Sequence, residues 1–165
     1  MKRLTTGALA ALAMATGSAQ AADDVTLQLK WVTQAQFAGY YVALENGFYE
    51  EEDLNVTIKP GGPDIAPPQV LAGGGADVLI EWMPAAMAAR EKGLPLVNIA
   101  QPFKSSGMML TCWKDSGIAA PADFAGKTLG VWFFGNEFPF MSWMSQLGIE
   151  TDGADDNGVA VLKQG

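Results

Sequence analysis

The chain has 165 residues, of which 49% are apolar, including five Trp and eight Phe, so we expect one domain or slightly more with a substantial core. Its 18 acidic residues outnumber 10 basic ones, and a surface of that charge is poorly suited to nucleic acid or anionic lipid. The chain contains no His and a single Cys, which excludes an internal disulfide and argues strongly against a metal site with nitrogen and sulfur ligands.

Residues 1–21 have the pattern of a secretory signal peptide. Lys2 and Arg3 form a basic start, an apolar run covers 4–15, and Ala19-Gln20-Ala21 is a small-x-small cleavage site. We expect cleavage after Ala21 and a periplasmic location. A short membrane anchor is the alternative, but the run is short and rich in Ala and Thr, which is unfavourable for spanning a bilayer.

The stretch that follows predicts a strand, a loop and a helix. Apolar residues alternate with polar ones from Val25 to Trp31, which is the period of a half-buried strand. Phe37, Tyr40, Tyr41 and Leu44 then recur at helical spacing, and Gly47 ends that helix. In open α/β sheets a ligand lies beyond the carboxyl ends of the strands, so the loop 32–36 is the first place to look for a site.

Strands and short helices continue to alternate up to residue 112. Predicted strands cover 54–58, 77–80, 96–100 and 108–113, and predicted helices cover 67–72 and 84–93. This order is typical of an α/β fold with a mostly parallel sheet. Cys112 lies in an apolar run, so we expect it to be a small buried side chain.

The pattern restarts after a change of composition near residues 114–120. A helical turn is predicted over 121–124, a strand over 128–132, a helix over 137–147 and a strand over 159–162. We therefore divide the chain into a signal peptide at 1–21, one α/β unit at 22–112 and the start of a second, incomplete α/β unit at 113–165.

Aromatic and polar residues gather where the predicted strands end. Aromatic faces beside carboxylates and amides suit a flat, nitrogen-containing ligand. A carboxylate next to a Trp at the end of a buried strand is costly unless something pairs with it, which favours Glu81 and Trp82. The predicted ligand-binding residues are Trp31, Gln36, Gly62, Glu81, Trp82, Phe103, Asn136 and Glu137.

Ordinary core packing is the alternative for the aromatic residues in this set and near it. Helical spacing favours a core role for Phe37, Tyr40 and Tyr41. For Trp132, which ends a predicted strand, and Phe134, which follows it, a core role and a ligand-binding role stay open.

Three stretches resemble the substrate-binding proteins of bacterial ABC importers in the NMT1/THI5-like group. They are LKWVTQAQFAGYYVALENGFYEEEDLNV, VLAGGGADVLIEWMPAAMAAREKGLPLVNIAQPF and DSGIAAPADFAGKTLGVWFFGNE. The resemblance implies a two-lobed periplasmic-binding-protein fold of type II, here an N-terminal fragment whose second lobe is truncated. It also implies a monomer that holds a small molecule between its lobes and docks on an ABC permease in the inner membrane.

The group includes binders of hydroxymethylpyrimidine-type thiamine precursors, flavins, sulfonates and nitrate. An aromatic-rich site is more similar to the heterocycle binders, because anion sites favour basic residues and bare backbone donors. By position, Trp31 resembles the residue that stacks on the ring, and Glu81, Asn136 and Glu137 resemble its polar partners.

The group also has an enzymatic branch that makes the thiamine pyrimidine from its own His and pyridoxal phosphate. That branch has Lys at the position of Glu81 and His at those of Ala85 and Phe37. We therefore expect no enzyme activity and no cofactor, although a pyrimidine synthase remains the competing class. A sensor domain of a membrane-bound signalling protein is a third class, and the signal peptide argues against a cytosolic enzyme.

Overall fold

The computed structural model describes residues 21–153 and 156–164. The predicted signal peptide lies outside this part of the chain, apart from Ala21. None of the helices formed by the described residues is both long enough and apolar enough to cross a membrane.

The first sheet is a three-stranded parallel sheet with β1 at its centre. β1 (Asp23–Gln28) pairs with β2 (Leu54–Lys59) on one side and with β3 (Val78–Leu79) on the other. The pairing continues just past the strands, since the Leu29 amide donates to the Lys59 carbonyl at 2.9 Å. The parallel α/β arrangement predicted from the alternating strands and helices is confirmed.

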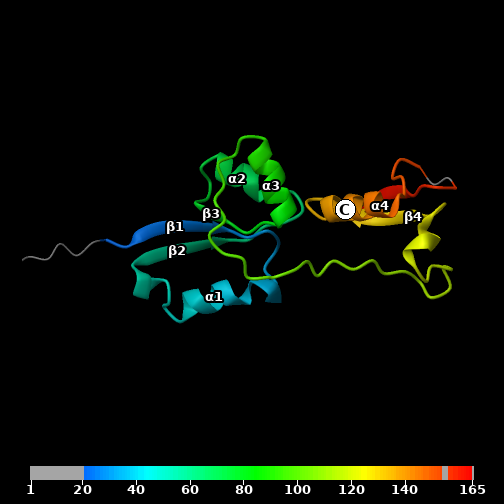
Figure 1. The fold of residues 1–165 in the computed structure, drawn as a ribbon. Helices are drawn as coiled ribbons and strands as arrows, with labels where there is room; N and C mark the ends of the chain where they lie inside the picture. Colours follow the sequence, from blue (N-terminus) through cyan, green and yellow to red (C-terminus); the bar gives the residue numbers. More distant parts are fainter. Residues whose placement is uncertain (1–20, 154–155, 165) are drawn as a thin grey trace, which may run out of the picture.

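Helices cover both faces of this sheet, as Figure 1 shows. α1 (Ala38–Glu45) lies on one side, and α2 (Pro67–Ala72) and α3 (Met83–Glu91) lie on the other. The core contains Phe37 as predicted, packed with Leu27, Leu29 and Val56.

Because both faces are covered, the carboxyl end of β1 is buried on both faces, and the predicted half-buried alternation fails there. Gln28 is only 3% exposed, and its side-chain amide donates to the carbonyls of Leu29, Lys59 and Pro60. These bonds satisfy a polar group that would otherwise be costly to bury, and they tie the end of β1 to the end of β2.

The second sheet has two parallel strands, β4 (Thr128–Trp132) and β5 (Ala160–Gln164). A 3₁₀ turn at Pro121–Phe124 precedes β4, and α4 (Glu137–Leu147) follows it, both as predicted. β5 begins one residue later than predicted and extends beyond residue 162. The core of the second sheet is separate from the core of the first sheet. It consists of Phe124, Leu129, Val131, Phe140, Met144 and Val159.

The two strands predicted at 96–100 and 108–113 do not form. This segment instead runs as an extended connection between the two sheets (Figure 1), with Val97 80% exposed and Met109 85% exposed. A strand needs a neighbour to satisfy its backbone groups, and no described strand pairs with this segment. Cys112 is exposed here as well, so the prediction that it is buried is wrong.

The loop after β2 lies directly against the end of β1 at Gly61. Its amide donates to the Trp31 carbonyl at 2.9 Å. A Cβ on Gly61 would come within 2.5 Å of the Leu29 carbonyl oxygen and 2.7 Å of the Lys30 carbonyl carbon. The absence of a side chain at Gly61 therefore sets where the chain leaves β1 and where Trp31 lies.

We predict that Gly61→Ala lowers the free energy of unfolding by about 2–3 kcal/mol, because the added methyl group meets backbone that cannot move aside cheaply. Urea unfolding followed by circular dichroism measures this change. Gly62→Ala is the matched control, since a Cβ there has no atom within 4 Å. Equal losses in both variants would contradict the assignment of a tight contact to Gly61.

Candidate functional site

The carboxyl ends of β1, β3 and β4 meet where the two sheets approach each other. Trp31 follows β1 and Trp132 is the last residue of β4, and their ring centroids are 5.2 Å apart with an interplanar angle of 86°. The two indoles thus form an edge-to-face pair that joins the two parts of the chain. We call the residues around this pair the junction: Lys30, Trp31, Glu81, Trp82, Trp132 and 135–137.

Gly135 lets the turn between β4 and α4 touch the start of α3 (Figure 1). It is buried with a φ of +123°, and a Cβ there would lie 2.9 Å from Trp82 Cδ1 and 3.4 Å from the Ala85 Cβ. The preceding residue, Phe134, also has a positive φ of 76°, a conformation that is uncommon for a bulky side chain. The turn therefore combines backbone strain with close contact between the two units.

Glu81 is the most buried charged group at the junction. Its side chain is 3% exposed, and Oε1 accepts from the Lys30 ammonium at 2.6 Å and from the Trp82 amide at 2.8 Å. Burial raises the pKa of Glu81 above its usual value, while the Lys30 ammonium and the Trp82 amide act in the opposite direction. The partner that a buried carboxylate was expected to need is therefore Lys30, a residue of the same chain.

Glu137 brings a second carboxylate to the junction. It is the first residue of α4, and its Oε2 accepts from the Gly135 amide at 2.6 Å. Its charge is close enough to contribute to the raised pKa of Glu81. Asn136 precedes it at the helix start and makes no side-chain capping bond. The three charged side chains of the junction thus sum to one negative charge beside two indoles.

Three of the predicted site residues lie outside the junction. Gln36 is exposed and donates to the Gln34 side chain at 3.0 Å. Phe103 is 59% exposed on the segment that connects the two sheets. Gly62 is buried in the loop after β2, beside Gly61. The structure brings together Trp31, Glu81, Trp82, Asn136 and Glu137 from the predicted set.

Sequence reasoning missed Lys30 and Gly135 at this place. The alternation from Val25 to Trp31 places Lys30 among the polar residues of a half-buried strand, which predicts a solvent-facing side chain. A basic residue directly before the Trp at a strand end, facing an acidic residue at the end of a neighbouring strand, is the signal that could have identified it.

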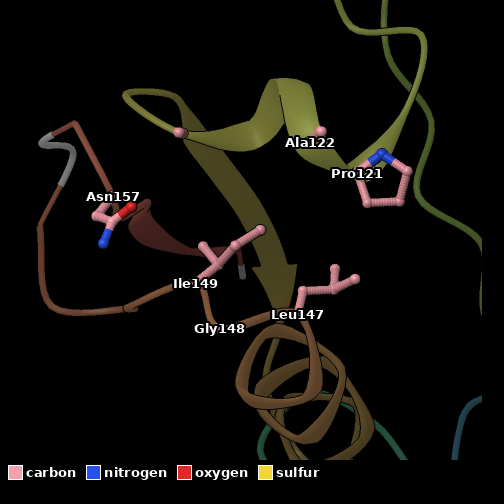
Figure 2. A pocket seen from close by; sticks show the side chains of 7 residues that line it. Pro121, Ala122, Leu147, Gly148, Ile149 and Asn157 are labelled. Carbon is pink, nitrogen blue, oxygen red and sulfur yellow. The ribbon is translucent and has the colours of Figure 1, made fainter.

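A hollow of about 280 Å³ lies elsewhere, at the far end of α4 (Figure 2). Its lining contains no charged side chain and only one amide side chain, and it is remote from the aromatic pair. It offers little chemistry for specific recognition, so the junction remains the candidate site. The hollow is lined by Pro121, Ala122, Ala125, Leu147, Gly148, Ile149 and Asn157.

Residues 34–165 match the sequence model of the family described as NMT1/THI5 like. The chain is 32% identical over 111 residues to the formylaminopyrimidine-binding protein of Halalkalibacterium halodurans. It is 33% identical over 108 residues to the 4-amino-5-hydroxymethyl-2-methylpyrimidine phosphate synthase of Legionella pneumophila. These matches cover 67% and 64% of this chain and 34% of each relative, so the chain spans about a third of the length of these relatives.

A solved structure shares the fold. It is described as a lipoprotein from Actinomyces odontolyticus and superposes with a TM-score of 0.51 at 10% identity. The likeness covers 86% of this chain and 63% of that one, so it extends over both sheets. This supports a mixed α/β architecture.

We predict that Trp31 and Trp132 stabilise each other by about 0.5–1.5 kcal/mol, the range for an edge-to-face aromatic pair. Urea unfolding of Trp31→Leu, Trp132→Leu and the double variant measures this coupling as a departure from additivity. The control is the pair Trp31→Leu and Trp143→Leu, because Trp143 forms its own edge-to-face contact with Phe124. Additive effects for Trp31 and Trp132 would show that the contact contributes nothing to stability.

Proposed function

Because this chain belongs to the NMT1/THI5-like family, we propose that it forms part of a solute-binding receptor of a bacterial ABC importer. Its ligand is a small planar heterocycle, such as a hydroxymethylpyrimidine-type thiamine precursor, held at the junction between the two units. The observation that carries this proposal is the Trp31–Trp132 pair with the Glu81 carboxylate beside it.

The aromatic pair supports a flat ligand. One indole presents its edge to the face of the other, so each ring has an aromatic partner of the kind that a ligand ring could provide. A heterocycle that stacks on Trp31 displaces Trp132 and exchanges one aromatic contact for another. Since the two indoles belong to different units, this exchange requires the units to separate and close again around the ligand.

The carboxylates support a ligand with N–H donors. Glu81 uses Oε1 for Lys30 and Trp82, and Glu137 uses Oε2 for Gly135. The second oxygen of each carboxylate makes no hydrogen bond within the described residues. An amino group or ring N–H can donate to these oxygens, whereas nitrate or a sulfonate would meet a site of net negative charge. A relative named as a formylaminopyrimidine-binding protein agrees with this chemistry.

Location and partners follow from the same proposal. The protein is exported, is cleaved after Ala21 and acts in the periplasm as a monomer that delivers its ligand to a membrane permease. Its two lobes, at 22–112 and 113–165, have the type II periplasmic-binding arrangement. Support comes from two parallel sheets with separate cores, joined at the ends of their strands.

The relative named as a pyrimidine phosphate synthase raises an enzymatic alternative. The residues here do not fit the pyridoxal phosphate chemistry of the enzymatic branch. The chain has no His, and Glu81 stands where that branch has its Lys. Lys30 lies nearby, but its ammonium is engaged in the ion pair with Glu81. We therefore propose a receptor without catalytic activity or a cofactor.

We predict that the full-length protein binds an amino-substituted pyrimidine and that the junction variants weaken binding. Glu81→Gln is expected to cost about 1–3 kcal/mol, because a carboxylate oxygen is replaced by a donor. Trp31→Ala is expected to cost about 0.5–1.5 kcal/mol beyond the lost contact area.

Titration calorimetry against pyrimidines, flavins, nitrate and sulfonates measures these effects. Phe103→Ala is the control, since Phe103 is exposed away from the junction, and it is expected to bind as tightly as wild type. Binding of nitrate or an aliphatic sulfonate alone would refute the proposal. Unchanged heterocycle binding by both junction variants would refute the site.

We also predict that the full-length protein forms no hydroxymethylpyrimidine phosphate when it is incubated with pyridoxal phosphate and iron. The reason is the absence of His together with Glu81 at the lysine position. Mass spectrometry of the small-molecule fraction, with the Legionella synthase assayed alongside as a positive control, measures the product. Even a single turnover by this protein would show that it is an enzyme.

A further inference from the structure

Lys30 and Glu81 form an ion pair between the ends of two neighbouring strands. The ammonium and carboxylate are 2.6 Å apart, and their side chains are 13% and 3% exposed. Lys30 directly precedes Trp31, and Glu81 directly precedes Trp82, so each member of the pair is followed in sequence by a Trp of the junction. The pair thus belongs to the junction and is not a solvated surface contact.

Four influences act on the charge of the Glu81 carboxylate: burial, Glu137, Lys30 and the Trp82 amide. Burial favours the protonated carboxyl, and so does the neighbouring charge of Glu137. Lys30 is the charged side chain that opposes them, through both its hydrogen bond and its charge. Without Lys30, burial and the charge of Glu137 both favour the protonated carboxyl, and only the hydrogen bond from the Trp82 amide opposes them.

The protonation state decides what this group can recognise. An ionised carboxylate only accepts hydrogen bonds, whereas a protonated carboxyl also donates one. A ligand N–H can donate to either oxygen of the ionised carboxylate. At the protonated carboxyl, it meets an O–H group that is itself a donor. The oxygen that Lys30 binds is also the one bound by the Trp82 amide, so the pair leaves Oε2 as the oxygen available to a ligand.

We propose that Lys30 is a positioning residue that determines specificity: its ammonium keeps the Glu81 carboxylate ionised and oriented, so that the site recognises a ring N–H or amino group. Lys30 itself need not touch the ligand. This inference rests on the proposed function, because it assumes that a donor-bearing heterocycle binds at the junction.

The test measures binding of 4-amino-5-hydroxymethyl-2-methylpyrimidine to the full-length protein by calorimetry at a series of pH values from about 5 to 8, all above the usual pKa of a glutamate carboxyl. The variants are Lys30→Met, Lys30→Gln and Glu81→Gln. Lys30→Gln keeps a hydrogen-bond donor without the charge and is the second variant if Lys30→Met folds poorly. The ratio of variant to wild-type Kd at each pH cancels the protonation of the ligand itself.

Lys30→Met and Lys30→Gln are expected to bind progressively more weakly than wild type as the pH falls. Their Glu81 has a higher pKa and becomes protonated first, so the Kd ratio rises by up to about tenfold per pH unit, the limit for one linked proton. Glu81→Gln is expected to bind more weakly by a factor that does not increase as the pH falls, because Gln has no carboxyl group to protonate. A Kd ratio for the Lys30 variants that is constant with pH would overturn the proposal.

A ligand-free measurement separates this inference from the proposed function. Carbon-13 NMR of labelled glutamate carboxyl groups gives the titration midpoint of Glu81, assigned by its absence in Glu81→Gln. The midpoint is expected to be higher in Lys30→Met than in wild type, and an unchanged midpoint would overturn the role of Lys30. Failure of wild type to bind any pyrimidine, together with a shifted midpoint, would instead count against the proposed function alone.

Discussion

Parallel pairing of β1 with both β2 and β3 is the constraint on which the rest of the first unit depends. It makes β1 the central strand, which requires helices on both faces and buries both sides of its carboxyl end. Parallel strands also end at the same edge of a sheet, so Lys30 and Trp31 come to lie beside Glu81 and Trp82. The ion pair and the aromatic pair are therefore consequences of strand order as much as of residue type.

Much of the architecture could be predicted from the alternation of strands and helices, because β1, β2, α2, α3, β4 and α4 each have local signals. The segment at 96–113 had equally good signals, yet it forms no strand, since a strand also needs a neighbouring backbone. Local sequence reports only the propensity of a segment and not the presence of a partner. The same distinction explains Cys112. It lies in an apolar run of the sequence, but it is exposed in the structure.

The aromatic and acidic residues of the candidate site could be predicted from the sequence. Lys30, Gly61 and Gly135, which position them, could not. Trp31 ends one predicted strand and Glu81 follows another, so a rule about strand ends finds them. Lys30 was not predicted as a site residue, because the alternation along the strand predicts that its side chain faces solvent. Only the three-dimensional arrangement shows its ion pair with Glu81. Gly61 and Gly135 act through the space that a missing side chain leaves, which depends on backbone from distant parts of the chain.

The contact between Trp31 and Trp132 has a spectroscopic consequence. Two indoles held nearly perpendicular at 5.2 Å couple their electronic transitions, and each lies within range to quench or exchange excitation with the other. Because the rings belong to different units, any rearrangement that parts them changes this coupling. The protein therefore contains an intrinsic optical reporter of the contact between Trp31 and Trp132, readable in the near-ultraviolet without any attached dye.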